Sequence, residues 1–292
     1  MEWYWLALLS ALLSALAAIL QKKVLFEISA LRFSLIVSLF VAVFSTFLIN
    51  NQTFTFFSIP SFIVLIFKSI LNASAFLCIM IALKNLDLSR TLPLLATSPM
   101  IIAILAYIFL GESLTNLEIS GMFLIVAGTY VLELKSNEKI LQPLKIYIES
   151  KFHKIILLAL LLMSVSSVLD KLLLTNFKLP PVTFLILQNY MFLIIFFIFW
   201  KIYCKKSGKE NLFSGLPRNV IILIIVIAIV TIGYRWLQFE STKIAPVGLV
   251  ISIKRLSVLF AVLIGAKIFK EENYFRKVVA TLLIVAGALM IY

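Results

Sequence analysis

Residues 121–128 read GMFLIVAG, and the last five letters, LIVAG, occur again at residues 283–287. The two copies are 159 positions apart, and the same offset places Glu112 on Glu271. Internal similarity over such a distance indicates that one unit was duplicated. The chain is therefore expected to fold as two related halves.

Apolar residues dominate the sequence outside these copies as well. Hydrophobic residues make up 63% of the 292 residues and charged residues 13%, which is far more apolar surface than one soluble core of this size needs. A membrane-spanning helix needs about 20 mostly apolar residues, and polar clusters divide the chain into ten such stretches. The predicted spans are residues 3–22, 28–49, 61–83, 91–111, 115–134, 154–174, 181–203, 218–240, 246–269 and 273–292. The sequence therefore predicts an all-α membrane protein with ten transmembrane helices.

The ten spans divide into two five-helix repeats, residues 1–134 and 154–292, joined by a charged connecting loop at residues 135–153. A shorter match, AAILQK at 17–22 with SSVLDK at 166–171, supports the division at an offset of 149. Because five is odd, the second repeat enters the membrane from the opposite side, which makes the repeats inverted. Inverted repeats place a binding site near the midplane, between halves that rock around it, which is the architecture of a transporter.

The positive charge of the chain predicts its orientation. The net charge is +13, but the 26 lysines and arginines are spread over short loops instead of one soluble face, so no nucleic-acid partner is expected. Eighteen lie in the loops after the odd-numbered spans, whereas the opposite loops hold three. Positive residues stay on the cytoplasmic side, so we expect cytoplasmic basic loops and outward-facing termini. The expected location is the plasma or inner membrane, as a monomer or homodimer surrounded by lipid.

The sequence lacks the residue clusters that catalysis or metal binding needs. His153 is the single histidine, Cys78 and Cys204 lie far apart, and the carboxylates of the spans lie near predicted helix ends. We therefore expect no enzyme activity, no metal and no cofactor. The two carboxylates closest to a role in proton transfer, Glu112 and Asp170, are interpreted as packing or capping residues.

Residues 250–260 read VISIKRLSVLF, with Lys254 and Arg255 eight and nine residues into the ninth span. A cation at the bilayer centre costs about 2.5–3.5 kcal/mol on insertion scales, so the two together cost roughly 5–7 kcal/mol. At about 1.5 Å per residue they lie roughly 12 Å deep, too far for easy snorkelling. We expect them to face a cavity and bind an anion. A structural ion pair is the alternative, although no carboxylate is predicted in the middle of a span.

Further polar residues within the spans are candidates for the same site. Lys68 and Asn72 are four residues apart on the third span, and Thr231 and Arg235 are four apart on the eighth, so each pair shares a helix face. The offset of 159 relates Asn72 to Thr231, and both pairs are therefore expected near the axis between the halves. On the seventh span, the adjacent amides Gln188 and Asn189 either bind a substrate or bridge helices. On the eighth span, Tyr234 and Trp236 are expected in the cavity wall.

These features together resemble the drug/metabolite transporter superfamily, specifically its EamA-type ten-helix carriers. The resemblance covers essentially the whole chain and rests on IFLGESLT at 108–115, GMFLIVAG at 121–128 and the second copy, FKEENYFRKVVATLLIVAG, at 269–287. It implies secondary transport of a small metabolite by alternating access, with a cavity lined by spans such as three, four, eight and nine. Members of the superfamily are generally drawn with both ends cytoplasmic, whereas the charge count here favours the opposite orientation.

The stretch PVGLVISIKRLSV at 246–258 also resembles the ninth helix of the sugar-phosphate translocators of that superfamily, in which a Lys-Arg pair holds the substrate phosphate. The resemblance implies this role for Lys254 and Arg255. Those translocators carry another lysine in helix four, where this chain has Leu95, so a carboxylate substrate is at least as well supported. The hypothesis is a secondary transporter of a small anionic or zwitterionic metabolite. The alternative is a non-transporting membrane receptor or assembly subunit that binds anionic lipid or an acidic partner.

Overall fold

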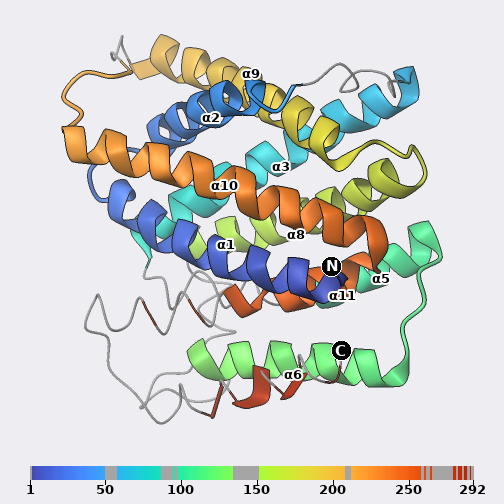
Figure 1. The fold of residues 1–292 in the computed structure, drawn as a ribbon. Helices are drawn as coiled ribbons and strands as arrows, with labels where there is room; N and C mark the ends of the chain where they lie inside the picture. The colour runs from blue at the N-terminus through green and yellow to red at the C-terminus, as the bar shows by residue number, and fades with distance from the viewer. Residues whose placement is uncertain are drawn as a thin grey trace.

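The computed structural model describes residues 2–49, 58–86, 95, 98–133, 151–207 and 212–257, together with 260, 264, 279–280, 282–284, 286–287 and 290. Every regular element within these residues is an α-helix (Figure 1). In chain order the helices are α1 (Trp3–Leu25), α2 (Ala30–Thr46), α3 (Ile59–Asn85), α5 (Ser98–Leu110), α6 (Asn116–Glu133), α8 (Lys151–Thr175), α9 (Pro181–Ser207), α10 (Arg218–Ile244) and α11 (Val247–Lys254).

Each of the first eight predicted spans overlaps one of these helices. Helices α1, α3, α8, α9 and α10 are long and apolar enough to cross a membrane, and α2, α5 and α6 are shorter apolar helices. Helices suit hydrocarbon because they satisfy their backbone hydrogen bonds internally. Most of the predicted connecting loop, the second half of the ninth span and much of the tenth span, 273–292, lie outside the described residues. The described part of the chain is thus an all-helical membrane protein.

Two hydrogen bonds fix the direction of α10 against α1. Ser241 Oγ, near the end of α10, donates to the backbone oxygen of Trp3 at the start of α1, at 2.8 Å. One and a half to two turns further along α1, Ser10 Oγ donates to the backbone oxygen of Tyr234, also at 2.8 Å. The two helices therefore run antiparallel and side by side, as Figure 1 shows.

A lysine near the end of the first helix of each repeat binds the last carbonyls of the third helix. Lys22 Nζ of α1 donates to the Leu83 oxygen of α3 at 2.5 Å, and Lys171 Nζ of α8 donates to the Thr242 oxygen of α10 at 2.9 Å. Each lysine also donates to the carbonyl three residues further on, at 2.8 and 2.7 Å. Cations there complement the negative end of the helix dipole.

These lysine contacts establish the inverted arrangement of the described helices. Helices α1 and α3 end on a common side of the bundle, because Lys22 joins their ends. Helices α8 and α10 likewise share a side at their ends, because Lys171 joins them. Since α1 and α10 run in opposite directions, the two repeats have opposite orientations. The lysines are themselves mates at the offset of 149, so the inversion predicted from the sequence is present in the hydrogen bonds.

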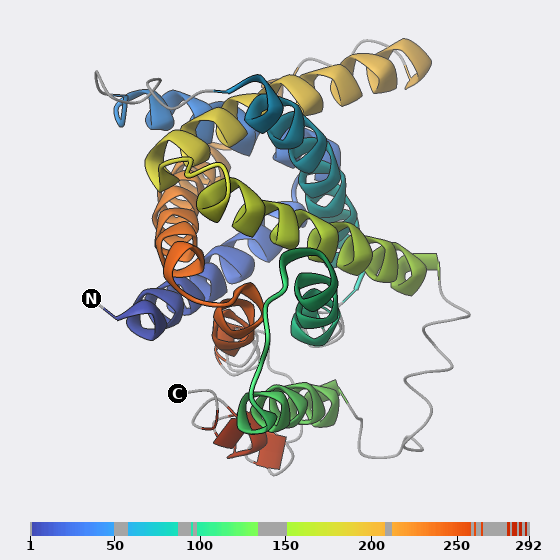
Figure 2. The same ribbon diagram turned by 90° about the vertical axis from the view of Figure 1, so that its right-hand side faces the viewer.

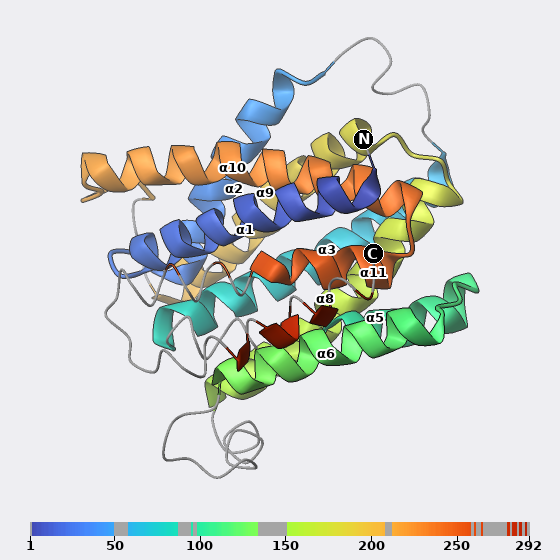
Figure 3. The ribbon, with the colours of Figure 1, turned by 60° about the horizontal axis from the view of Figure 1, so that its bottom comes forward.

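The repeated LIVAG segments pack against each other at one edge of the bundle. A Cβ added to Gly128 would lie 2.7 Å from Ile284 Cγ1, and one added to Gly287 would lie 2.5 Å from the Gly121 oxygen. Figures 1, 2 and 3 show α6 at this edge, beside the described C-terminal residues. Only glycine permits so close an approach of two helix backbones in lipid.

Helix α11 is shorter than the predicted ninth span. It ends at Lys254, and the Arg255 amide donates to two carbonyls of the last turn at 3.0 Å. At its start, the Val247 amide donates to Glu112 Oε2 at 3.1 Å, and Glu112 also forms an ion pair with Lys171 at 3.5 Å. Glu112 is therefore a capping residue, as predicted. Residues 256–257, 260 and 264 are again helical, so the Lys-Arg pair lies at a turn within the ninth predicted span.

Candidate functional site

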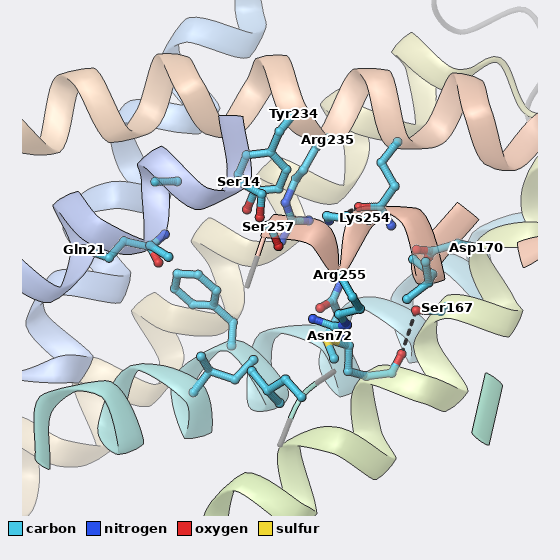
Figure 4. A pocket seen from close by; sticks show the side chains of 18 of the residues that line it. Ser14, Gln21, Asn72, Ser167, Asp170, Tyr234, Arg235, Lys254, Arg255 and Ser257 are labelled. Carbon is cyan, nitrogen blue, oxygen red and sulfur yellow. Dashed lines mark hydrogen bonds between the residues drawn. The ribbon is translucent and has the colours of Figure 1, made fainter. Parts of the chain in front are cut away.

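A cavity of about 160 Å³ lies between the two repeats. Its walls come from α1 and α3 of the first repeat, with Leu95, and from α8, α10 and α11 of the second. Figure 4 shows Arg235, Lys254, Arg255 and Asp170 gathered around it. A buried water needs only about 10–15 Å³, so a small molecule fits.

Much of the lining consists of residues related by the repeat offsets. Both members of seven such pairs border the cavity: Ser14 with Met163, Ala18 with Ser167, Gln21 with Asp170, Phe76 with Arg235, Ile79 with Gln238, Met80 with Phe239, and Leu95 with Lys254. Every charged member of these pairs belongs to the second repeat, whereas the polar Ser14 of the first repeat has the apolar mate Met163. The cavity is therefore symmetric in its backbone and asymmetric in its charge.

Lys254 borders the cavity from the end of α11. Its Nζ donates to Gln238 Oε1 and lies 4.8 Å from the centre of the Tyr234 ring. Both partners are neutral, and no carboxylate within the described residues forms an ion pair with Lys254. A cation over an aromatic face gains about 0.5–2 kcal/mol, less than the roughly 2.5–3.5 kcal/mol that a charge costs at the membrane centre. The hydrogen bond to Gln238 adds about 1.5–3 kcal/mol, so the described contacts about offset that cost but supply no counter-charge.

Two arginines border the same cavity. Arg255 donates from Nε and Nη2 to Ser98 Oγ, at 3.0 and 2.7 Å. The guanidinium of Arg235 lies 4.9 Å from the centre of the Phe192 ring and forms no hydrogen bond with any residue that the structure describes. A guanidinium carries five N–H donors in a fork that matches carboxylate or phosphate oxygens. Both arginines therefore have donors left for a ligand.

Lys68 and Asp170 form a buried ion pair beside the cavity. Lys68 Nζ lies 2.7 Å from Asp170 Oδ1, and the two side chains are 0% and 6% exposed. Lys68 also donates to Gln188 Oε1 at 2.5 Å and lies 4.6 Å from the centre of the Phe184 ring. It does not line the cavity, although it was a candidate for the site.

The structure corrects the interpretation of Asp170 as a helix-end packing or capping residue. Asp170 lies five residues before the end of α8, where it binds Lys68 of α3 and also lines the cavity. The expectation that no carboxylate lies among the cations therefore fails. The alternative of a structural ion pair applies to Lys68, whereas Lys254 and Arg255 have only neutral partners within the described residues.

The predicted partnership of Asn72 and Thr231 differs from the observed geometry. Asn72 lines the main cavity, whereas Thr231 lines a second cavity of about 20 Å³ together with Asn189. Arg235 and Phe76, which are mates at the offset of 159, border both cavities and separate one from the other. The repeat offset relates the positions of Asn72 and Thr231 but does not bring the two side chains into one site.

The two amides of α9 bridge helices. Gln188 accepts from Lys68 of α3, and Asn189 Nδ2 donates to Ser45 Oγ of α2 at 2.7 Å. Gln188 is fully buried and away from the main cavity. Of the two aromatic residues expected in the wall, Tyr234 lines the cavity, while Trp236 is 44% exposed and lies outside it.

Several polar residues of the site escaped the reasoning from sequence, namely Gln21, Ser98 and Gln238. Two signals could have found two of them: the offset of 149 places Gln21 on Asp170, and Gln238 follows Arg235 by three residues, on the same face of α10. A metal site has no support within the described ranges, which contain no group of three His, Cys, Asp or Glu residues able to hold an ion.

Comparison with known proteins places this geometry in a family. A search of curated proteins finds no match. A search of solved structures finds 29 chains that match. One of them, described as "Crystal structure of protein", aligns with 99% of this chain over 94% of its own length, at a TM-score of 0.65 and 16% sequence identity. This likeness shows a shared fold. The model of the EamA-like transporter family matches residues 1–134 and again 152–292. Since both halves match, this chain belongs to the EamA-like transporter family.

Proposed function

We propose that this protein is a secondary transporter that carries a small anionic or zwitterionic metabolite through ten transmembrane helices by alternating access. The observation that supports it most is the set of three cations, Arg235, Lys254 and Arg255, that border one cavity without an ion pair to any described carboxylate. Each is costly in a membrane. A bound carboxylate or phosphate would offset that cost through charge-assisted hydrogen bonds.

The packing of the repeats supports movement around this site. Within each repeat, a lysine ties the first helix to the end of the third, so that these helices move together. Between the repeats, α1 packs on α10 and α3 packs on α8. Rocking at these two interfaces would open the cavity first to one side of the membrane and then to the other. The basic loops are proposed to lie on the cytoplasmic side of the plasma or inner membrane.

A receptor or assembly subunit that binds anionic lipid remains the competing hypothesis. Such a protein needs basic surface loops, but it has no use for cations placed around an internal cavity. The neutral partners of Lys254 therefore favour the carrier.

The test is the thermal stability of the purified protein in detergent, with and without phosphates, carboxylates and amino acids. A ligand that binds the folded state raises the melting temperature. Removing one partner of a buried charge-assisted contact costs about 2–5 kcal/mol, so Arg235→Gln and Lys254→Gln are expected to weaken anion binding by about 30-fold or more. The matched control is Lys201→Gln, an exposed lysine of α9 outside the cavity.

Anion binding that survives both cavity substitutions would remove this site. Stabilisation by anionic lipid, without stabilisation by any small anion, would favour the receptor. For the anion that binds, uptake into liposomes containing the purified protein then measures transport directly, and uptake is expected to fall in the same two variants.

A further inference from the structure

Asp170 is the one carboxylate of the described residues that borders the cavity. Its Oδ1 faces Lys68, while its Oδ2 receives no hydrogen bond from a residue that the structure describes. Figure 4 shows Asp170 beside the cationic groups of the cavity. One carboxylate oxygen is therefore available to a group that enters from the cavity.

The charged side chains that contact Asp170 or border the same cavity, from the described helices packed on α8, are all cations: Lys68 from α3, Arg235 from α10, Lys254 at the end of α11, and Arg255 directly after it. Tyr234 of α10 is a further titratable side chain that lines the cavity. The remaining packed helix, α5, has Tyr107 as its one titratable side chain, and that side chain is 67% exposed. Lys171, next in sequence, points to the end of α10 and to Glu112.

The ion pair also crosses the interface between the repeats, because Lys68 belongs to α3 of the first repeat and Asp170 to α8 of the second. A rocking motion changes the distances across this interface, so the pair has to stretch or break during transport. Separating two buried charges is costly unless one of them is neutralised. A proton on Asp170 neutralises the carboxylate and lowers that cost.

Protonation of Asp170 also changes the charge of the site. A proton delivered by water in the cavity forms an O–H bond on the carboxylate, while Lys68 keeps its own proton. The positive charge of Lys68 is then no longer cancelled, and the region around the cavity gains one positive charge. An anion binds more strongly to such a site, and by linkage a bound anion strengthens proton binding equally.

We propose that Asp170 is the proton-binding residue of this transporter, so that one proton and the anionic substrate bind the cavity together and cross the membrane as a symport. This inference rests on the proposed function, because it needs an anion in the cavity. Glu112, the other described acid with a lysine partner, also forms its ion pair across the repeats, but it is partly exposed and lies outside the cavity, so a ligand in the cavity does not bind beside it.

The experiment uses sulfate as the probe, because its charge is constant between about pH 5 and pH 8. Sulfate affinity of the purified full-length protein is measured across that range, and proton uptake on binding is followed with an indicator dye in weak buffer. In the wild type the affinity is expected to rise by up to about tenfold per unit fall in pH, with proton uptake. Asp170→Asn is expected to bind sulfate tightly at every pH, without proton uptake.

Two variants make the result specific. Glu112→Gln removes the acid of the other lysine pair, and it is expected to keep the pH dependence. The double substitution Lys68→Gln with Asp170→Asn removes both charges of the pair and guards against misfolding of the single variant. Its affinity is expected to be independent of pH and as weak as that of the wild type at high pH, because Lys68 no longer adds its charge.

The outcomes separate this inference from the proposed function. Sulfate binding that does not depend on pH in the wild type, or that keeps its pH dependence in Asp170→Asn, overturns the symport and leaves the anion site standing. No sulfate binding at any pH, in any variant, overturns the anion site and the symport together.

Discussion

Replacing Lys68 by methionine is expected to destabilise the protein much more than replacing Lys254 by methionine, although both lysines are embedded in the same helix bundle. Lys68→Met removes the 2.7 Å ion pair with Asp170 and the 2.5 Å hydrogen bond to Gln188. It also leaves a buried carboxylate without its cation. Removing one partner of a buried ion pair costs about 3–5 kcal/mol.

Lys254→Met has two opposing effects. It removes the hydrogen bond to Gln238 and the contact with the Tyr234 ring, a loss of about 2–5 kcal/mol. It also removes a cation that costs about 2.5–3.5 kcal/mol near the membrane centre. The two effects largely cancel, because the ranges give a net loss in the free energy of unfolding between about −1.5 and 2.5 kcal/mol, with a midpoint of about 0.5 kcal/mol. Compared with the midpoint of about 4 kcal/mol for Lys68→Met, the expected difference between the variants is about 3.5 kcal/mol.

Unfolding in mixed micelles with increasing sodium dodecyl sulfate, followed by tryptophan fluorescence, measures this difference. A double variant, Lys68→Met with Asp170→Leu, is expected to recover most of the stability lost by Lys68→Met, because apolar pairs can replace buried ion pairs without loss. Equal losses for Lys68→Met and Lys254→Met would show that Lys254 has a structural role. That result would refute the argument that the cavity cations are kept for a ligand.

Three further predictions concern the packing, two of them with a matched control substitution. Gly287→Ala would place a Cβ 2.5 Å from a backbone oxygen of α6 and is expected to cost about 1–3 kcal/mol of stability. In the control, Gly233→Ala, the new Cβ would meet its nearest neighbour at 3.4 Å, so no loss of stability is expected. The melting temperatures of the two variants test this difference. Lys171→Met removes the donor to the last carbonyls of α10, and faster hydrogen exchange is expected at that helix end. Ser98→Ala removes the oxygen that accepts from Arg255 and is expected to cost about 1–3 kcal/mol in the same melting assay, whereas Ser98→Thr keeps the acceptor.

The inverted fold could be predicted because duplication leaves a record that sequence alone preserves. The LIVAG copies identified two equivalent segments, and the structure packs the glycine of each copy against the other segment, Gly128 on Ile284 and Gly287 on Ile125. The shorter match at an offset of 149 identified Lys22 and Lys171 as equivalent, and these two lysines make the same hydrogen bonds in the two repeats. Equivalent residues in equivalent backbones have equivalent local partners, so a repeat in sequence predicts local contacts well.

Contacts between the repeats could not be predicted in this way. Lys68 and Asp170 are not related by either offset, and each has an apolar or neutral mate in the other half, so nothing in the sequence joins them. Depth along a span was also a poor guide. Asp170 lies near a helix end, yet α3 and α10 cover it, so distance from the end of a helix does not measure distance from water.

The distribution of charge over the two repeats has a mechanical consequence. Arg235 and Lys254 lie on α10 and α11 of the second repeat, opposite their apolar mates Phe76 and Leu95 of the first. In the proposed mechanism, an anion held by these two cations would keep its hydrogen bonds while the repeats rock, because both donors move with one body. The apolar wall of the first repeat would slide past the ligand without breaking polar contacts. The Lys68–Asp170 pair and the Lys171–Glu112 pair both join the two bodies, but of these two only the first borders the cavity, so the charge of Asp170 links the energy of rocking to the contents of the cavity.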